Sequence, residues 1–286
     1  KKLLIPDTPN YLYEPIKYAL KGGGKRLRPI LTHLVGRTYN TDPNSLMNIS
    51  LAIELLHNFT LIHDDIMDKD IIRHSQKTIH HKWDTSTAIL AGDGIYTIAQ
   101  LVLNSIDRYD KEINKCFNEV TLDICEGQAL DKEFENLDNV TEDLYLEMIK
   151  KKTGSLIAAA AMLPSIYAED EIENTELFRT FGESLGKGFQ IHDDLLEITS
   201  DSKIMGKSLD SDIFEGKQTI MVIKAKQYYK ESWDSIVLNS KKSDLKKNIY
   251  TFFDEKKIIE ETKHIAESYF KKSRNILKKL NHNNSD

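Results

Sequence analysis

Long stretches in which apolar residues recur every three or four positions place the tightest limit on the fold of this chain. Such spacing gathers apolar side chains on one face of a helix, and no alternating pattern typical of strands persists. The 286 residues include only six prolines, which would interrupt helices. The sequence therefore predicts an all-α protein. The stretches with this spacing are residues 46–62, 88–106, 113–130, 144–163, 175–198 and 219–229.

Polar or glycine-containing segments separate these stretches. None resembles a long flexible linker, and the helical spacing resumes after each one, so we predict a single domain over residues 1–286. The segments are residues 21–25, 39–44, 73–78, 136–141, 164–174, 200–216 and 240–244.

The tail from Tyr250 onwards is rich in lysine. Its apolar residues keep helical spacing, which predicts packed helices with a solvated basic face. His282 lies in the polar ending and is not expected to be a ligand. The apolar residues are Phe252, Phe253, Ile258, Ile259, Ile265, Phe270, Ile276 and Leu277.

Composition excludes several classes of function. Hydrophobic residues make up 40% of the chain, enough for a large core, and the net charge of −6 gives no support to a nucleic-acid partner. No apolar run approaches the roughly 20 residues that cross a bilayer, and residues 156–163 are expected to be tightly packed helix. The first seven residues lack the apolar core of a signal peptide. Cys116 and Cys125, the only cysteines, predict ordinary buried thiols in a reducing, cytoplasmic compartment.

Three carboxylates follow an apolar stretch at Asp64, Asp65 and Asp68. On a helix, Asp64 and Asp68 lie one turn apart on nearly the same side. Like charges this close raise one another's pKa unless cations lie between them, and Mg²⁺ prefers such oxygen ligands.

The acidic motif occurs twice. Ile-His-Asp-Asp-Ile-Met-Asp at residues 62–68 is matched by Ile-His-Asp-Asp-Leu-Leu-Glu at residues 191–197. A single Asp-Asp motif would be interpreted as acidic residues at a solvated helix end. Two copies with matching apolar neighbours, where charge is costly, predict two helices that face each other across a cleft with metal between them.

A glycine-rich basic segment, Gly-Gly-Gly-Lys-Arg-Leu-Arg-Pro at residues 22–29, is a candidate anion site. Glycine amides can approach phosphate oxygens closely, and Lys25 and Arg28 add charge. The spacing is not that of a P-loop. More cations lie near predicted loops and helix ends; each alone would be a surface charge, but together they match two diphosphate groups. These cations are Arg73, Lys152, Lys207 and Lys217.

With these motifs in this order, the chain resembles the trans-isoprenyl diphosphate synthases, or polyprenyl synthetases, over residues 22–217. The family makes farnesyl, geranylgeranyl and longer diphosphates. The matching motifs are residues 23–29, Asp64 to Asp68, Gly127-Gln128 with Asp131, Lys152-Thr153-Gly154, Gly188-Phe189-Gln190 before Asp193-Asp194, and Gly206-Lys207 before Gly216-Lys217.

The resemblance implies a role for each matching residue. Isopentenyl diphosphate would be bound by Lys25, Arg28 and His57. Two Mg²⁺ ions on the allylic diphosphate would be held by Asp64 and Asp68 and a third by Asp193, assisted by Asp65, Asp194 and Asp131. The allylic diphosphate would contact Arg73, Lys152, Lys207 and Lys217. Thr153 and Gln190 would flank the reacting carbons. The fold implied is a bundle of mostly antiparallel helices around a deep central cavity, usually in a homodimer.

Three positions depart from the family pattern. His74 replaces an arginine that normally assists isopentenyl diphosphate, and because histidine is not reliably charged at neutral pH, we expect weaker binding of that substrate. Ser75-Gln76-Lys77 replaces Gly-x-Pro, so this loop is expected to differ. Glu197 ends the second acidic motif in place of aspartate and is expected to be tolerated.

The expected reaction is ionisation of the allylic diphosphate, attack by the double bond of isopentenyl diphosphate, and proton loss, with pyrophosphate as the base. The growing chain would run along the helix that carries Asp64. Phe59, five residues before Asp64, would narrow this path, and Thr60 is small. One aromatic residue here, rather than two, predicts a C20 product, with C15 as the alternative.

Two other functions remain open at this stage. A class I terpene cyclase also uses an aspartate-rich motif, but it would not need the glycine-lysine-arginine segment. A non-catalytic synthase subunit would have no need of Asp64, Asp65, Asp68, Asp193 and Asp194.

Overall fold

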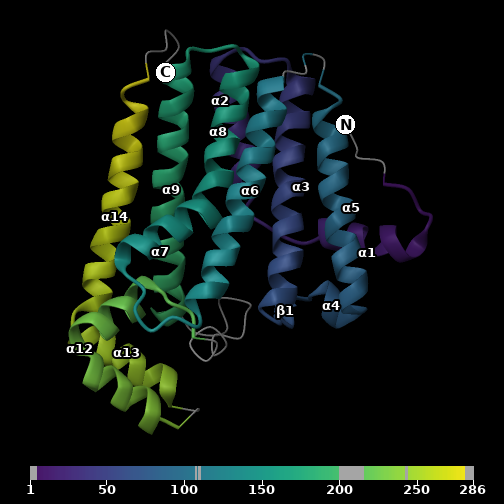
Figure 1. The fold of residues 1–286 in the computed structure, drawn as a ribbon. Coiled ribbons are helices and arrows are strands. Elements are labelled where there is room, and N and C mark those ends of the chain that lie inside the picture. Colours follow the sequence, from purple (N-terminus) through teal and green to yellow (C-terminus); the bar gives the residue numbers. More distant parts are fainter. Residues whose placement is uncertain (1–4, 107, 109–110, 200–215, 242–243, 281–286) are drawn as a thin grey trace. The chain divides into compact units, whose positions relative to one another are not determined.

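The computed structural model describes residues 5–106, 108, 111–199, 216–241 and 244–280. Apart from one two-stranded hairpin, the regular secondary structure of these residues is helical (Figure 1), so the predicted all-α fold is confirmed. The elements are α1 (Asn10–Leu20), α2 (Leu27–Thr38), α3 (Pro43–Met67), β1 (Ile72–Arg73), β2 (Gln76–Lys77), α4 (Ile79–Lys82), α5 (Thr85–Leu103), α6 (Lys111–Phe134), α7 (Glu142–Ile149), the π-helix η1 (Lys150–Gly154), α8 (Ser155–Tyr167), α9 (Ile172–Thr199), α12 (Ile220–Asn239), α13 (Leu245–Glu255) and α14 (Ile258–Leu277).

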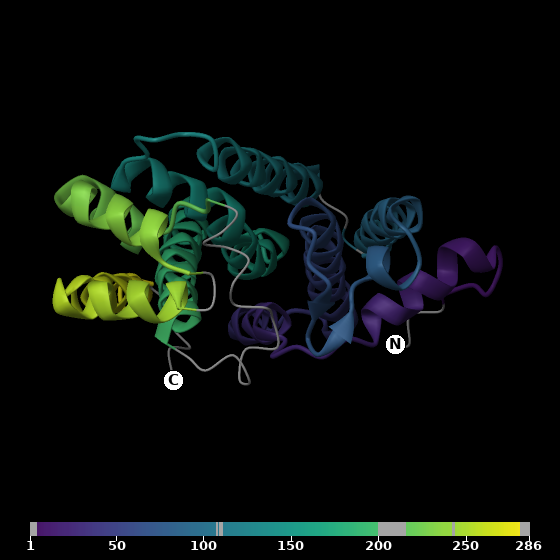
Figure 2. The ribbon, with the colours of Figure 1, turned by 90° about the horizontal axis from the view of Figure 1, so that it is seen from below.

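Most of the predicted helical stretches fall within helices, although residues 104–106 follow the end of α5 and Thr219 caps the start of α12. Two other details of the prediction were wrong. Residues 144–163 form α7, η1 and α8 in succession rather than one helix, and α8 continues through Pro164 to Tyr167. The segment at residues 73–78 is a two-stranded hairpin, seen as a small arrow in Figure 2. His74 and Ser75 both have positive φ at its tip, the conformation that two-residue hairpin turns require.

The chain divides into two compact units, which are described separately. Unit 1 contains residues 1–121, 156–179 and 279–286, and unit 2 contains residues 122–155 and 180–278. Both boundaries after residue 121 and after residue 179 fall inside helices, α6 and α9. The assignment of residues 1–286 to one domain stays a prediction.

In unit 1, α3 and α5 lie side by side and supply much of the core (Figure 1). Ile53 of α3 and Ile95 of α5 are fully buried. By length and composition alone both helices could cross a membrane, contrary to the expectation that no segment approaches this limit, although core helices of soluble proteins share these properties. Residues 156–163 are buried throughout, as predicted. Cys116 is buried, but the prediction for Cys125 was wrong because this thiol is exposed.

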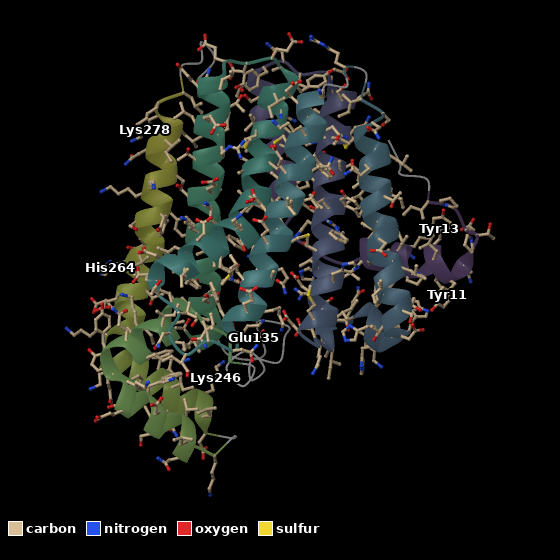
Figure 3. All side chains as sticks on the ribbon, in the orientation of Figure 1. Tyr11, Tyr13, Glu135, Lys246, His264 and Lys278 are labelled. Atoms are coloured by element: carbon tan, nitrogen blue, oxygen red, sulfur yellow. The ribbon has the colours of Figure 1, made fainter. Side chains whose placement is uncertain are left out.

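In unit 2, the core is built from the ends of α6 and α9 together with α7, α12, α13 and α14. Phe253 of α13 stacks on Trp233 of α12 with ring centroids 5.6 Å apart. The basic tail packs as predicted, since α14 buries Ile258 and Ile276 and turns His264 and Lys278 outward (Figure 3). Leu277 is the exception, because it is exposed. His282 lies outside the described residues.

Candidate functional site

The first acidic motif lies at the C-terminal end of α3. Pro43 occupies the first turn of this helix, and the Asp42 side chain caps it by accepting from the Ser45 backbone N–H at 2.8 Å. At the other end, Asp64 is in the last turn and Asp68 is the C-terminal cap, with no basic residue in that turn. Because the C-terminal end of a helix carries partial negative charge, carboxylates there are unfavourable without a cation nearby.

Arg73 of β1 supplies part of the missing positive charge. Its Nε donates to Asp65, and a terminal nitrogen donates to Asp70 at 3.0 Å. Burial alone would lower the pKa of Arg73, but Asp65, Asp70 and Asp64 more than offset this, and the pKa is raised. The hairpin that carries Arg73 is held next to Asp70, because the Thr78 hydroxyl donates to the Asp70 backbone carbonyl at 2.6 Å. Arg73 is therefore fixed beside the acidic motif.

Arg28 of α2 and His57 of α3 lie together in unit 1, with Nη1 and Nε2 3.2 Å apart. Burial lowers the pKa of Arg28 to about 10 despite the opposing effect of Glu54. Burial, and then the charges of Arg28, Arg73 and His74, hold the pKa of His57 well below its ordinary value of 6.5. Nε of Arg28 is buried without a hydrogen-bond acceptor among the described residues. Converging positive charge with an unused donor is what an anion needs.

Lys25, predicted to act with Arg28, is exposed in the segment before α2. His74 is also exposed, at the hairpin tip, and its charge adds to the lowering of the His57 pKa. The structure thus brings Arg28 and His57 together.

Phe59, predicted to limit product length, is part of an aromatic group. Its ring packs edge-on against His63, with ring centroids 4.7 Å apart, and lies tilted against Tyr96 of α5, with centroids 5.4 Å apart. None of the three is fully buried, so the group borders accessible space. The Tyr96 hydroxyl donates to Asn118 at 3.0 Å, which holds this ring in place. Thr60 donates back to the His57 carbonyl at 2.8 Å and adds little bulk.

The second acidic motif lies in unit 2, in the last turns of α9, again without a basic residue in the final turn. Asp193 is exposed, and Asp194 is buried. Asp194 accepts from the Tyr145 hydroxyl at 2.7 Å and from the Gln190 amide at 2.9 Å. Gln190 in turn accepts from the Thr153 hydroxyl at 2.8 Å. Burial, followed by the charge of Asp194, raises the pKa of Tyr145 well above 10, so this phenol keeps its proton.

The predicted contact residues Lys152 and Thr153 belong to η1, a single π-helical turn of the kind that often marks functional sites. Lys152 Nζ lies 2.5 Å from a carboxylate oxygen of Asp131 on α6. The backbones of α6 and η1 touch at Gly127, where a Cβ would lie 2.3 Å from the Lys152 nitrogen. Only glycine permits this approach, so Gly127 fixes where Lys152 lies.

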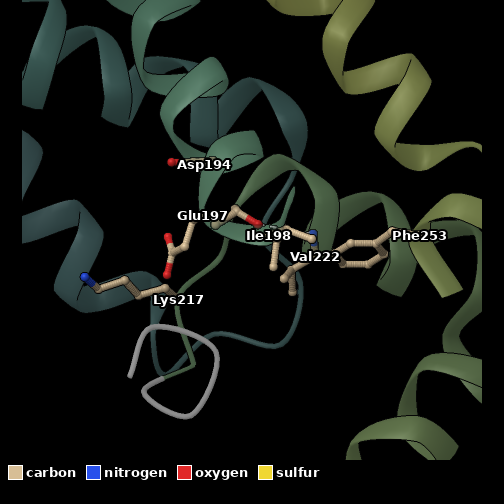
Figure 4. A pocket seen from close by; sticks show the side chains of 7 residues that line it. Asp194, Glu197, Ile198, Lys217, Val222 and Phe253 are labelled. Atoms are coloured by element: carbon tan, nitrogen blue, oxygen red, sulfur yellow. Dashed lines mark hydrogen bonds between the residues drawn. The ribbon is translucent and has the colours of Figure 1, made fainter. Parts of the chain in front are cut away.

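Asp194, Glu197 and Lys217 line one pocket of unit 2 (Figure 4). Its apolar side is formed by Ile198, Val222 and Phe253, with Thr219 completing the lining. The glutamate that departs from the family pattern therefore lies beside a predicted diphosphate contact. Lys207, also predicted to contact diphosphate, lies outside the described residues.

The donor chemistry of both acidic motifs fits Mg²⁺. Within the described ranges, no group of three or more His, Cys, Asp or Glu residues could hold a metal ion by itself. Mg²⁺ does not need such a group, because it is usually bound by one or two carboxylates together with substrate phosphates and water. Asp64 with Asp68, and Asp193 on α9, offer carboxylates of this kind.

Sequence reasoning missed three residues of these groups, Asp70, Tyr96 and Tyr145. Asp70 carried the clearest signal, since it is an aspartate three residues before Arg73. Tyr96 and Tyr145 are ordinary apolar-face positions in the sequence, and only the packing of helices shows that they touch Phe59 and Asp194.

Known proteins resemble this chain closely. The polyprenyl synthetase family profile matches residues 9–253. A geranylgeranyl pyrophosphate synthase of Geoglobus acetivorans is 44% identical over 229 residues, covering 79% of this chain and 71% of the relative. A geranylgeranyl diphosphate synthase of Methanosarcina mazei is 42% identical, covering 78% and 70%. A geranylfarnesyl diphosphate synthase of Natronomonas pharaonis is 38% identical, covering 77% and 70%.

Solved structures agree with these relatives. A geranylgeranyl pyrophosphate synthase structure matches with a TM-score of 0.89 and 34% identity, over 97% of this chain and 88% of that one. The synthetase of Pyrococcus horikoshii matches with a TM-score of 0.85 and 33% identity, over 96% and 86%. The chain belongs to the polyprenyl synthetase family, has the all-α isoprenoid synthase fold, and is a trans-prenyltransferase.

Proposed function

We propose that this enzyme condenses isopentenyl diphosphate with an allylic diphosphate and releases mainly the C20 product, geranylgeranyl diphosphate. The observation that carries the proposal is the presence of two kinds of anion-binding chemistry. Carboxylates at the ends of α3 and α9 suit a metal-bound diphosphate, whereas Arg28 and His57 suit a directly bound one. The names of the relatives from Geoglobus acetivorans and Methanosarcina mazei support the C20 length.

In the proposed reaction, the C–O bond of the allylic diphosphate breaks and the bonding electrons leave with pyrophosphate. Mg²⁺, when bound to Asp64, Asp68 and Asp193, would stabilise charge on this leaving group. Arg73 and Lys152 would add fixed positive charge where the negative charge grows. We propose three Mg²⁺ ions in total, two held by Asp64 and Asp68 and a third by Asp193.

Arg28 and His57 would hold isopentenyl diphosphate. The guanidinium can grip a phosphate through two nitrogens, and its buried Nε has a donor to offer. His57, with its lowered pKa, is a neutral donor at physiological pH. The double bond of this substrate attacks the allylic cation, forming the new C–C bond, and the released proton passes to pyrophosphate. Thr153 and Gln190 would flank the reacting carbons.

The direct test is incubation of the purified protein with Mg²⁺, radiolabelled isopentenyl diphosphate and farnesyl diphosphate, followed by chromatography of the dephosphorylated products. The expected product is geranylgeraniol. A cyclic hydrocarbon from an allylic diphosphate alone would instead indicate a terpene cyclase, and no consumption of label would indicate a non-catalytic subunit. If shorter allylic substrates give farnesol as the end product, the enzyme would instead be a synthase of the C15 product.

Product length is proposed to depend on Phe59, because its ring forms a partly exposed aromatic group with His63 and Tyr96, five residues before Asp64 on the same helix. Phe59→Ala should shift the product beyond C20. Phe178→Ala provides the matched control, since this buried phenylalanine of unit 1 contacts Tyr39 and lies outside the aromatic group. Unchanged products from Phe59→Ala would place the length limit elsewhere.

A homodimer in the cytoplasm is also proposed. Helix α5 exposes Ile89, Leu90 and Leu101, which are 44%, 46% and 64% exposed, and an apolar helix face of this kind suits a subunit interface. Sedimentation should give twice the chain mass of 32.9 kDa. A monomeric mass would overturn this part without affecting the proposed reaction.

A further inference from the structure

Tyr145 is a buried polar side chain for which the proposed reaction has no use. It lies in the first turn of α7, where Thr141 caps the helix, and only 1% of its surface is exposed. A buried phenol normally finds a hydrogen-bond partner, and this one reaches the carboxylate of Asp194 at 2.7 Å. Its partner is therefore a member of the second acidic motif rather than a backbone group of the core.

The other oxygen of Asp194 is also occupied. The Gln190 amide nitrogen donates to it at 2.9 Å, and the Thr153 hydroxyl fixes the orientation of that amide by donating to its oxygen at 2.8 Å. Side chains from α7, η1 and α9 thus form a hydrogen-bond network in which Tyr145 and Gln190 both donate to Asp194, and Thr153 donates to Gln190. With a donor on each oxygen, the carboxylate plane cannot rotate freely.

The donors from Tyr145 and Gln190 are both neutral. A neutral donor orients a carboxylate and lowers the cost of burying its charge, and it leaves that charge available to a cation. Asp193, the exposed neighbour of Asp194, is the predicted metal ligand. An Asp194 carboxylate turned away from Asp193 would no longer add its charge at the same place.

We propose that Tyr145 is a positioning residue, which holds Asp194 in the orientation needed for the second acidic motif to take up a divalent cation. This inference rests on the proposed function of the motif as a metal site. Tyr145 acts through Asp194, so it is expected to affect metal uptake rather than substrate contact.

The test is Tyr145→Phe, which removes one hydroxyl and keeps the ring. Loss of such an orienting partner typically weakens metal binding on the order of 10-fold or more. The Mg²⁺ concentration for half-maximal activity should therefore rise on the order of 10-fold, with kcat largely restored at saturating Mg²⁺. Independently of turnover, Mn²⁺ bound in the presence of inorganic pyrophosphate, followed by electron paramagnetic resonance of the free ion, should weaken in parallel.

Tyr39→Phe is the matched control, because Tyr39 also donates to an aspartate, Asp170, in unit 1. It should lower thermal stability without changing either metal measurement. If Tyr145→Phe likewise changes only stability, Tyr145 is a core residue and the proposal is overturned. Absence of prenyl transfer by the unmodified protein would instead refute the proposed function, while the Mn²⁺ measurement would still report on Tyr145.

The double variant Tyr145→Phe/Asp194→Asn tests whether Tyr145 affects metal binding through Asp194. Once Asp194 is neutral, adding Tyr145→Phe should leave Mn²⁺ binding at the level of Asp194→Asn alone, and a further loss would show that Tyr145 acts elsewhere. If Tyr145→Phe fails to fold but the double variant folds, stability itself demonstrates the coupling to Asp194. Failure of both to fold would assign Tyr145 to core packing.

Discussion

The two acidic motifs share a sequence pattern and a position at the end of a helix, but the side chains around them differ. Asp65 of the first motif accepts from the guanidinium of Arg73, which also binds Asp70. Asp194 of the second accepts from a phenol and an amide. A cation cancels carboxylate charge, whereas neutral donors only orient it. Repeated sequence therefore does not imply repeated electrostatics.

This difference suggests that the two motifs have different roles. In the first motif, Asp65 is joined to the cation Arg73, and Asp64 and Asp68 are the proposed metal ligands. In the second, orientation by Tyr145 keeps the charge of Asp194 beside the exposed Asp193. We infer that loss of Arg73 will disturb charge balance and folding at the first motif, whereas loss of Tyr145 will disturb metal uptake at the second.

The largest expected effect is that of Asp64→Ala, because it removes charge stabilisation needed only in the transition state. The value of kcat should fall on the order of 10³-fold, the upper range for losing one preorganised electrostatic contact. Steady-state assays with radiolabelled isopentenyl diphosphate measure this, and undiminished chain growth in Asp64→Ala would refute the role of the first motif.

Arg73→Gln should lower the free energy of unfolding, because the first motif contains ion pairs with Arg73. The variant leaves Asp65 and Asp70 buried without their cation, and breaking such a pair costs about 3 kcal/mol. Urea unfolding measures the free energy of unfolding. Arg179→Gln is the control, since its pair with Glu176 is on the surface and contributes less than about 1 kcal/mol. Equal losses in the two variants would contradict the comparison.

Gly127→Ala should displace Lys152 in unit 2 without changing any charged group. The added Cβ would lie 2.3 Å from the Lys152 nitrogen, so η1 must shift. A shift of about 1 Å at a reacting group can reduce the rate by about 10²-fold. Leu122→Ala, on an exposed face of the same helix, is the control for kcat. Normal kcat in Gly127→Ala would show that the position of η1 is not critical.

The smallest effect concerns His57 and pH. Its pKa lies below 6.5 in the folded protein, so below pH 6.5 the unfolded chain binds a proton that the folded chain does not. The stabilising contribution of the neutral imidazole is therefore complete above pH 6.5 and is lost as pH falls below it. Relative to His57→Gln, the wild type should lose stability as the pH falls below about 6.5, measured by urea unfolding. A constant difference would mean that His57 is not desolvated.

Much of the site could be read from the sequence, because chemistry is carried by residue type. The acidic motifs, Arg28 with His57, and Lys152 with Thr153 were all predicted, and the structure places each on a helix end, a helix face or a tight turn that suits its role. The partners could not be predicted in the same way. Nothing in the spacing of Tyr145 and Asp194, 49 residues apart, indicates that they touch.

The sequence alone determined the helical class, through apolar spacing that can be buried only on helices, and it determined which side chains can bind diphosphate and metal. The tertiary structure decided which side chains contact these carboxylates, a guanidinium at Asp65 and a phenol and an amide at Asp194. It also turned the expected loop at residues 73–78 into a hairpin carrying Arg73, and exposed Cys125. The physical reason is that helical periodicity is local, whereas burial and hydrogen-bond partners depend on residues distant in the chain.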